Sequence, residues 1–149
     1  MLQLEKIKSI WGGLVKEKYM LKVKTYVSES KIHGKGLFSK QFIPKGTIVW
    51  KFDPDSDIVI TKDDWDYIIK KFKKLIIFMN IEQYSWKDED NIYICIDDCK
   101  YMNHSETNNL SAPIKNTLLV ANRNIEIGEE LTENYYEFGN QGVDNGKQF

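Results

Sequence analysis

The chain has 149 residues, of which 42% are hydrophobic and 13% aromatic, so it can form one domain with a packed core and is not a disordered chain. Its 21 basic and 22 acidic residues give a net charge of −1, which excludes the strong positive field of a dedicated nucleic-acid binder. It has neither the ~18-residue apolar run of a membrane span nor the apolar core of a signal peptide. We therefore expect a cytoplasmic protein without a direct nucleic-acid or membrane partner, although host-directed secretion stays open.

The first third of the chain indicates an extension followed by short strands. Residues 1–19 form the extension, and the spacing of apolar residues over 3–11 predicts a short amphipathic helix inside it. Residues 19–27 alternate as a strand does, and 28–36 read as a loop. Two further short strands, joined by the turn residues Pro44-Lys45-Gly46, are predicted at 37–38 and 47–50.

The middle of the chain contains one convincing helix, which Thr61 or Asp63 can cap. Apolar residues at three- and four-residue spacing predict one buried face. We interpret the lysines on the opposite face as solvated, without a binding role. The apolar residues are Trp65, Ile68, Ile69, Phe72, Leu75, Ile76 and Met79, and the lysines are Lys70, Lys71, Lys73 and Lys74.

Short strands dominate the rest of the sequence. Residues 58–60 are strand-like, a turn at 87–91 leads into a strand at 92–96, and another strand covers 118–121. The glycine- and asparagine-rich residues 139–149 read as a flexible tail. Because strands and helices do not alternate, we expect an α+β domain, mostly β with one main helix, and not a doubly wound parallel sheet.

Two cysteines, Cys95 and Cys99, lie four residues apart. A bridge between the end of a strand at 91–96 and Cys99 would need a sharp turn, and a disulfide framework needs more than two cysteines. We therefore expect two buried free thiols in a reducing cytoplasm. Two thiols without a nearby pair of histidines also make a poor zinc site, so no metal site is predicted.

Four segments, in this order, resemble the motifs of SET domains, the fold of protein-lysine methyltransferases. His33–Phe38 resembles the opening glycine motif, and Ile43–Val49 resembles the turn that follows it. Asp97–Asn109 resembles the Asn-His-Ser segment, and Asn124–Tyr135 resembles the ending segment with its late tyrosine. The glycine motif alone is weak evidence, but the last two segments are specific. The resemblance covers about residues 20–138 and is strongest to small stand-alone bacterial members.

The resemblance implies a β-clip fold of small sheets in which the Asn-His-Ser segment and the ending segment cross in a C-terminal pseudoknot. It also implies that S-adenosylmethionine binds where the two segments meet. Main-chain groups around Lys35 and Gly36 would hold its methionine portion, Asn103 its amino group and His104 its adenine. Glycine suits such a loop because backbone without a Cβ can approach a ligand closely. Without the resemblance, a structural role for His104 would be the simpler interpretation.

Tyr135 is the residue that we expect to serve the chemistry, and it would also contact the cofactor. A methyl transfer to an amine needs alignment above all, and a tyrosine with an ordinary pKa near 10 is a poor base at neutral pH. An apolar channel and a neighbouring sulfonium both favour the neutral lysine amine. Aromatic candidates for the channel are Tyr84, Tyr101 and Tyr136, with Phe138 expected to pack on adenine. Taken singly, such an aromatic residue is more often part of the core.

The sequence departs from the family pattern at Asn108, Asn134 and Lys100, where proline, aspartate and arginine are usual. Asn109 matches the asparagine that follows the histidine in the family. No cysteine-rich segments flank the domain, so the tail or a second subunit in a homodimer would have to complete the substrate channel. The leading hypothesis is a methyltransferase acting on a protein or peptide lysine. The alternative is a SET-fold module that binds a peptide or the cofactor without turnover.

Overall fold

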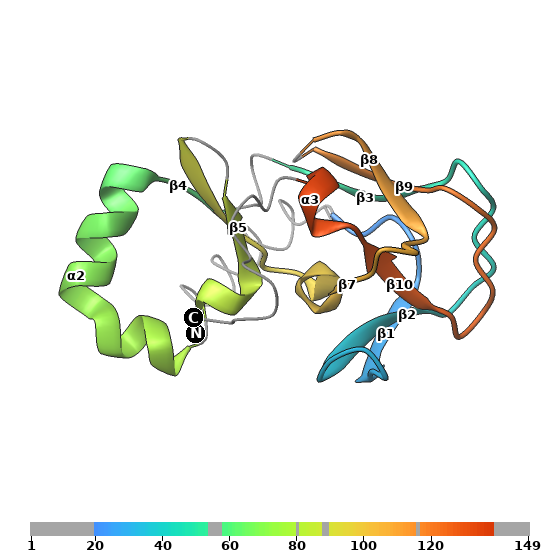
Figure 1. Ribbon diagram of the computed structural model, residues 1–149, viewed down its shortest axis with the longest axis horizontal. Helices are drawn as coiled ribbons and strands as arrows, with labels where there is room; N and C mark the ends of the chain where they lie inside the picture. Colours follow the sequence, from blue (N-terminus) through green and yellow to red (C-terminus); the bar gives the residue numbers. More distant parts are fainter. Residues whose placement is uncertain (1–19, 54–57, 80, 88–89, 116, 139–149) are drawn as a thin grey trace, which may run out of the picture.

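The computed structural model of the protein describes residues 20–138, apart from 54–57, 80, 88–89 and 116 (Figure 1). The predicted extension at 1–19, with its helix at 3–11, and the predicted tail at 139–149 lie outside the described residues. Within them, no helix combines the length and the apolar character needed to cross a membrane.

The larger of two sheets has seven strands in the order β1-β2-β10-β8-β9-β3, and β7 pairs with β10 beside this path. Several of its strands lie where the sequence predicted them, but the first one is shifted. The predicted strand at 19–27 contains only a bridge between Leu21 and Trp50 before β1 begins. The strands are β1 (Thr25–Glu29), β2 (Lys35–Ser39), β3 (Ile48–Lys51), β7 (Asn103–His104), β8 (Leu110–Ile114), β9 (Leu118–Ala121) and β10 (Glu130–Glu133).

The last strand, β10, holds this sheet together because it pairs with three partners. Its first half is antiparallel to β2, with Leu131 opposite Leu37. Its second half is parallel both to β7, with Glu133 opposite His104, and to β8, with Glu133 opposite Leu110. The ending segment of the chain therefore runs alongside the Asn-His-Ser segment in the middle of the sheet (Figure 1).

The smaller sheet, of order β4-β6-β5, lies next to the one long helix, α2, which Figure 1 shows in green at the opposite end of the molecule from β1 and β2. β5 and β6 are antiparallel, so the chain reverses between them as predicted. The elements are β4 (Ile58–Thr61), α2 (Lys62–Phe78), the 3-10 helix η1 (Ile81–Tyr84), β5 (Ser85–Lys87) and β6 (Asn91–Ile94).

Helix α2 begins as predicted but does not bury the predicted face. The Thr61 hydroxyl accepts the Asp64 N–H at 3.2 Å, which caps the helix. At Phe72 the backbone leaves helical geometry, with φ −122° and ψ 24°. Beyond this kink Leu75 is 52% exposed, whereas its neighbour Ile76 is buried. The prediction of one continuous buried face is therefore wrong, since of its seven residues only Trp65 and Ile76 are buried.

The main core lies under the seven-stranded sheet. Leu37, Val49, Leu110 and Leu131 are fully buried there, from four different strands. A second, smaller cluster of Trp65, Ile76 and Ile92 joins α2 to the three-stranded sheet. The predicted class, mostly β with one main helix, is confirmed.

Candidate active site

The loop between β1 and β2 is fastened to the middle of the sheet by Asn103. The Asn103 amide nitrogen donates to the carbonyl oxygens of His33 and Lys35, each at 3.1 Å, and to Glu130 Oε1 at 2.8 Å. Gly36 allows this approach, because a Cβ there would collide with the Glu130 carboxylate and lie 3.1 Å from Ser30 Cβ. Lys35, Gly36 and Asn103, which the sequence predicted to meet, do lie together.

Asn109 joins the two crossing segments from the other side. Its amide nitrogen donates to the Glu130 carbonyl at 2.8 Å and to Glu129 Oε1 at 3.0 Å, and its Oδ1 accepts the Thr132 N–H at 2.9 Å. The residue is 1% exposed, so these bonds replace all of its contacts with water. The resemblance to SET domains matched Asn109 to an asparagine of the family without giving it a role. In the structure its hydrogen bonds hold β10 in register.

Tyr135, the first residue of the short helix α3 (Tyr135–Phe138), is held at both ends. Its hydroxyl donates to the Met102 carbonyl at 2.8 Å, and its N–H donates to His104 Nδ1 at 3.2 Å. The pKa of Tyr135 is raised mainly by burial and further by the charge of Glu133, and the His104 bond only partly opposes this. Tyr135 therefore stays protonated and cannot act as a base at neutral pH.

Glu133, two residues before Tyr135, was not predicted as a site residue. Its Oε2 atom is sealed from solvent and has no hydrogen-bond partner among the described residues. Burial alone raises the pKa of this carboxyl to about 8. A sequence signal existed: strand side chains alternate, so Glu133 shares a face with Leu131, which is fully buried.

The aromatic residues predicted to line a channel fall into two groups. The Tyr84 and Tyr101 rings meet edge to face, with centroids 5.8 Å apart, under the Lys100 ammonium. The Tyr136 ring packs instead against His104, at 5.5 Å, and is exposed. Met102 connects the two groups, since it follows Tyr101 in the chain and its carbonyl accepts a hydrogen bond from the Tyr135 hydroxyl. Phe138 ends α3, but its side chain lies outside the described residues.

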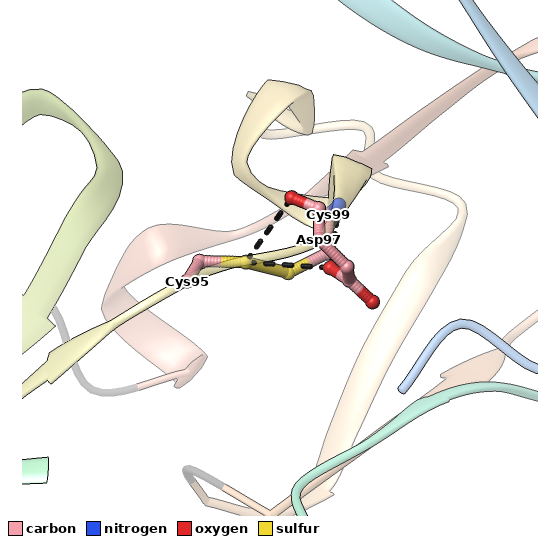
Figure 2. A group of neighbouring side chains, drawn as sticks. All are labelled: Cys95, Asp97 and Cys99. Atoms are coloured by element: carbon pink, nitrogen blue, oxygen red, sulfur yellow. Dashed lines mark hydrogen bonds between the residues drawn. A yellow bond between two sulfur atoms is a disulfide. The ribbon is translucent and has the colours of Figure 1, made fainter. Parts of the chain in front are cut away.

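Cys95 and Cys99 form a disulfide, so the prediction of two free thiols is wrong (Figure 2). After β6, the chain turns through the 3-10 helix η2 (Asp98–Tyr101), which Asp97 caps, and the two Cα atoms come within 6.8 Å. This is within bonding reach for a disulfide.

Asp97 lies between the bridged cysteines and ties this turn to the start of the domain. Its carboxylate accepts the N–H groups of Cys99 at 2.9 Å and of Leu21 at 3.1 Å. Burial raises the pKa of Asp97 despite these bonds. The three side chains bring potential metal-ligand atoms within 4.8 Å of one another, but the sulfur atoms are bonded together and the carboxylate is engaged. We therefore assign the cluster a structural role in placing Met102 and Asn103.

The geometry thus brings the middle and ending segments together around Tyr135, and comparison with protein families agrees with it. The SET-domain family matches residues 34–136, which is more than half of the chain. The chain belongs to the SET-domain family. A search of curated proteins finds no match. Lysine methylation is the usual activity of SET domains, and they typically bind S-adenosylmethionine.

The donors and acceptors at the crossing fit the cofactor that SET domains use. Asn103 Oδ1 makes no hydrogen bond with a described residue and can accept one from an ammonium group. His104 uses Nδ1 as an acceptor, so in its neutral form Nε2 carries the hydrogen. Acceptors for an amino group and a flat ring for adenine are therefore both present on β7.

Proposed function

We propose that the protein is an S-adenosylmethionine-dependent protein-lysine N-methyltransferase. The observation that carries the proposal is the fixed Tyr135 hydroxyl, which the Met102 carbonyl holds beside the crossing in a member of the SET-domain family. By the family pattern, Lys35, Gly36, Asn103 and His104 would hold the cofactor, with Tyr135 and Phe138 beside it. When bound, the cofactor supplies an electrophilic methyl group on a sulfonium.

The proposed work of Tyr135 is alignment and not proton transfer. Direct displacement at a methyl group needs the acceptor amine on the line of the breaking bond, and fixed groups supply this geometry without reorganising. The Tyr135 hydroxyl gives its hydrogen to Met102 and keeps its oxygen lone pairs, which can accept a hydrogen bond from the amine.

The proposed substrate is a lysine side chain of a protein or peptide. The T-shaped pair Tyr84 and Tyr101 already has the Lys100 ammonium above both rings, at 5.6 and 5.3 Å from their centroids. Such rings also suit a lysine stem or a methylated ammonium. Completion of the channel by the tail or by a second copy of the chain remains part of the proposal.

The decisive experiment measures methyl transfer from labelled S-adenosylmethionine to a pool of lysine peptides. We expect the wild-type protein to release S-adenosylhomocysteine and Tyr135→Phe to lose about 100-fold in kcat. Tyr67→Phe is the matched control, because it removes the same atom from an exposed tyrosine on α2. Undiminished turnover by Tyr135→Phe would contradict the assigned role.

A second candidate function is a SET-fold module that binds without turnover. Tyr136 favours it, because this expected channel residue is 55% exposed among the described residues. Calorimetry separates the two functions: a module binds the cofactor or peptide yet forms no product, whereas an enzyme does both. A well-folded protein that binds no cofactor would contradict both the enzyme and a cofactor-binding module.

A further inference from the structure

One oxygen of the Glu133 carboxyl is buried without a partner among the residues that the structure describes. It lies on β10 at the level where this strand pairs with both His104 and Leu110. Its Oε2 atom is inaccessible and makes no hydrogen bond within the described residues. A buried polar group without a partner costs free energy, and such groups are rare unless they serve a function.

The direction of the side chain follows from strand geometry. Leu131 packs in the main core, and the Thr132 hydroxyl accepts a hydrogen bond from the Asn109 N–H. Because side chains alternate along a strand, Glu133 lies on the same face of β10 as Leu131. That core also contains Met102, whose carbonyl holds the Tyr135 hydroxyl. Glu133 ends β10 two residues before Tyr135 begins α3, and its charge adds to the burial that raises the pKa of Tyr135.

No described charge compensates a Glu133 carboxylate. On the elements next to it, the ionisable side chains are Lys35 on β2, His104 on β7, and Tyr135, Tyr136 and Glu137 on α3; β8 has none. Burial raises the pKa of Glu133, and its buried Oε2 atom makes no hydrogen bond to any of these described groups. When Glu133 is ionised, a cation from outside the described residues would compensate its charge.

We propose that the Glu133 carboxylate receives the ε-ammonium group of the substrate lysine, accepts one of its protons, and holds the resulting amine beside Tyr135. This inference rests on the proposed methyltransferase function and adds the residue that frees the amine. One N–H bond breaks and one O–H bond forms, and the electron pair stays on nitrogen. The proton later leaves Glu133 for solvent.

The proton balance favours this transfer in a buried site. A lysine has an ordinary pKa near 10.4, and burial lowers the pKa of an ammonium while it raises that of a carboxyl. A neutral amine beside a neutral acid places no charge in the interior, whereas the ion pair places two there. A carboxyl that titrates at about 8 is also well matched to a proton acceptor near neutral pH.

The first test is the pH profile of kcat/KM for methylation of a lysine peptide by Glu133→Gln. The substitution keeps the shape of the side chain and removes its ability to take a proton. We expect about a 100-fold loss at pH 7 that shrinks as the pH approaches 10, where free amine is already present. Glu137→Gln is the control, since it removes an exposed carboxyl from the same segment and keeps the wild-type profile. A wild-type profile for Glu133→Gln would overturn the inference.

The second test needs neither cofactor nor turnover. In wild-type protein carrying glutamate labelled with ¹³C at Cδ, the Glu133 signal is assigned by its loss in Glu133→Gln and followed against pH. We expect a midpoint near pH 8 that n-butylammonium chloride lowers, because the cation stabilises the carboxylate. Sodium chloride at equal ionic strength is the control. A midpoint that n-butylammonium does not shift would overturn the inference.

The two tests separate failure of the inference from failure of the proposed function. An active wild-type enzyme with an unshifted midpoint and an unchanged Glu133→Gln profile contradicts the inference alone. A wild-type protein that methylates no lysine contradicts the proposed function and the proton transfer with it. A shifted midpoint in that inactive protein would still support an ammonium site at Glu133.

Discussion

The two ends of the molecule differ in how completely they bury their apolar side chains. In the seven-stranded sheet, Leu37, Leu110 and Leu131 have no exposed surface, whereas Phe78 at the end of α2 is 85% exposed. The sheet end is fastened by side chains that link distant segments, such as Asn103 and Asn109. The α2 end depends on a small cluster around Trp65. Tight packing can fix the positions of reacting groups, while the other end can rearrange at lower cost.

The largest expected effect comes from truncating a core leucine in the sheet. Leu110→Ala leaves a cavity in a fully buried place, and we expect a loss of about 4 kcal/mol in the free energy of unfolding. Leu75→Ala makes the same chemical change on half-exposed α2 and should cost less than about 1 kcal/mol. Urea unfolding measures both, and equal losses would remove the distinction between the two ends.

The next largest effect tests the hydrogen bonds at the crossing. Asn109→Ala leaves the Thr132 N–H and the Glu130 carbonyl without their partner in a buried place, so we expect a loss of about 3 kcal/mol. Asn124→Ala is the control, because the Asn124 side chain accepts the Lys45 N–H on an exposed turn. If both variants unfold at the same urea concentration, Asn109 does not hold β10 as described.

The buried Glu133 makes a smaller, pH-dependent difference. Its pKa is raised from 4.5 to about 8 in the folded protein, so between these values the unfolded chain loses the proton first. Stability is fully present below pH 4.5, falls as the pH rises, and levels off above about 8. The side chain is only half-buried as a whole, so we expect a fall on the order of 2 kcal/mol. Glu133→Gln should flatten this part of the stability curve; an unchanged curve would contradict the assignment.

The smallest effect concerns the cap of α2. Thr61→Val removes the hydroxyl that accepts the Asp64 N–H, and we expect a loss of about 1 kcal/mol confined to the α2 end. Amide hydrogen exchange should accelerate in α2 and leave the β10 amides unchanged. Acceleration at Thr132 by the same factor would show that the two ends unfold as one unit.

The sequence predicted well those elements whose bounds depend on nearby side chains, such as helix caps and turns. Thr61 caps α2, turn residues separate the short strands, and four motif segments placed Lys35, Asn103 and Tyr135 near the crossing. These results follow from side-chain chemistry and from family resemblance. Neither depends on how the two ends of the molecule pack.

The failures come from features that depend on surroundings. The kink at Phe72 interrupts α2, residues of the predicted face beyond it are exposed, and apolar spacing carries no sign of the kink. The Cys95–Cys99 bridge depends on the turn that Asp97 caps, which a strand prediction through 96 hides. Glu133 was not singled out from the sequence, because its burial depends on the pairing of β10 with β7 and β8, which are distant in the sequence.

The position of β10 also determines when the site can exist during folding. Its partners are β2 from the start of the domain and β7 and β8 from the middle, so every pairing that supports Tyr135 closes a long loop. Such contacts form late, because loop-closure entropy must be overcome before they contribute. A chain still emerging from the ribosome has β2 and β7 but no site. Cofactor binding, where it occurs, therefore reports a completed fold.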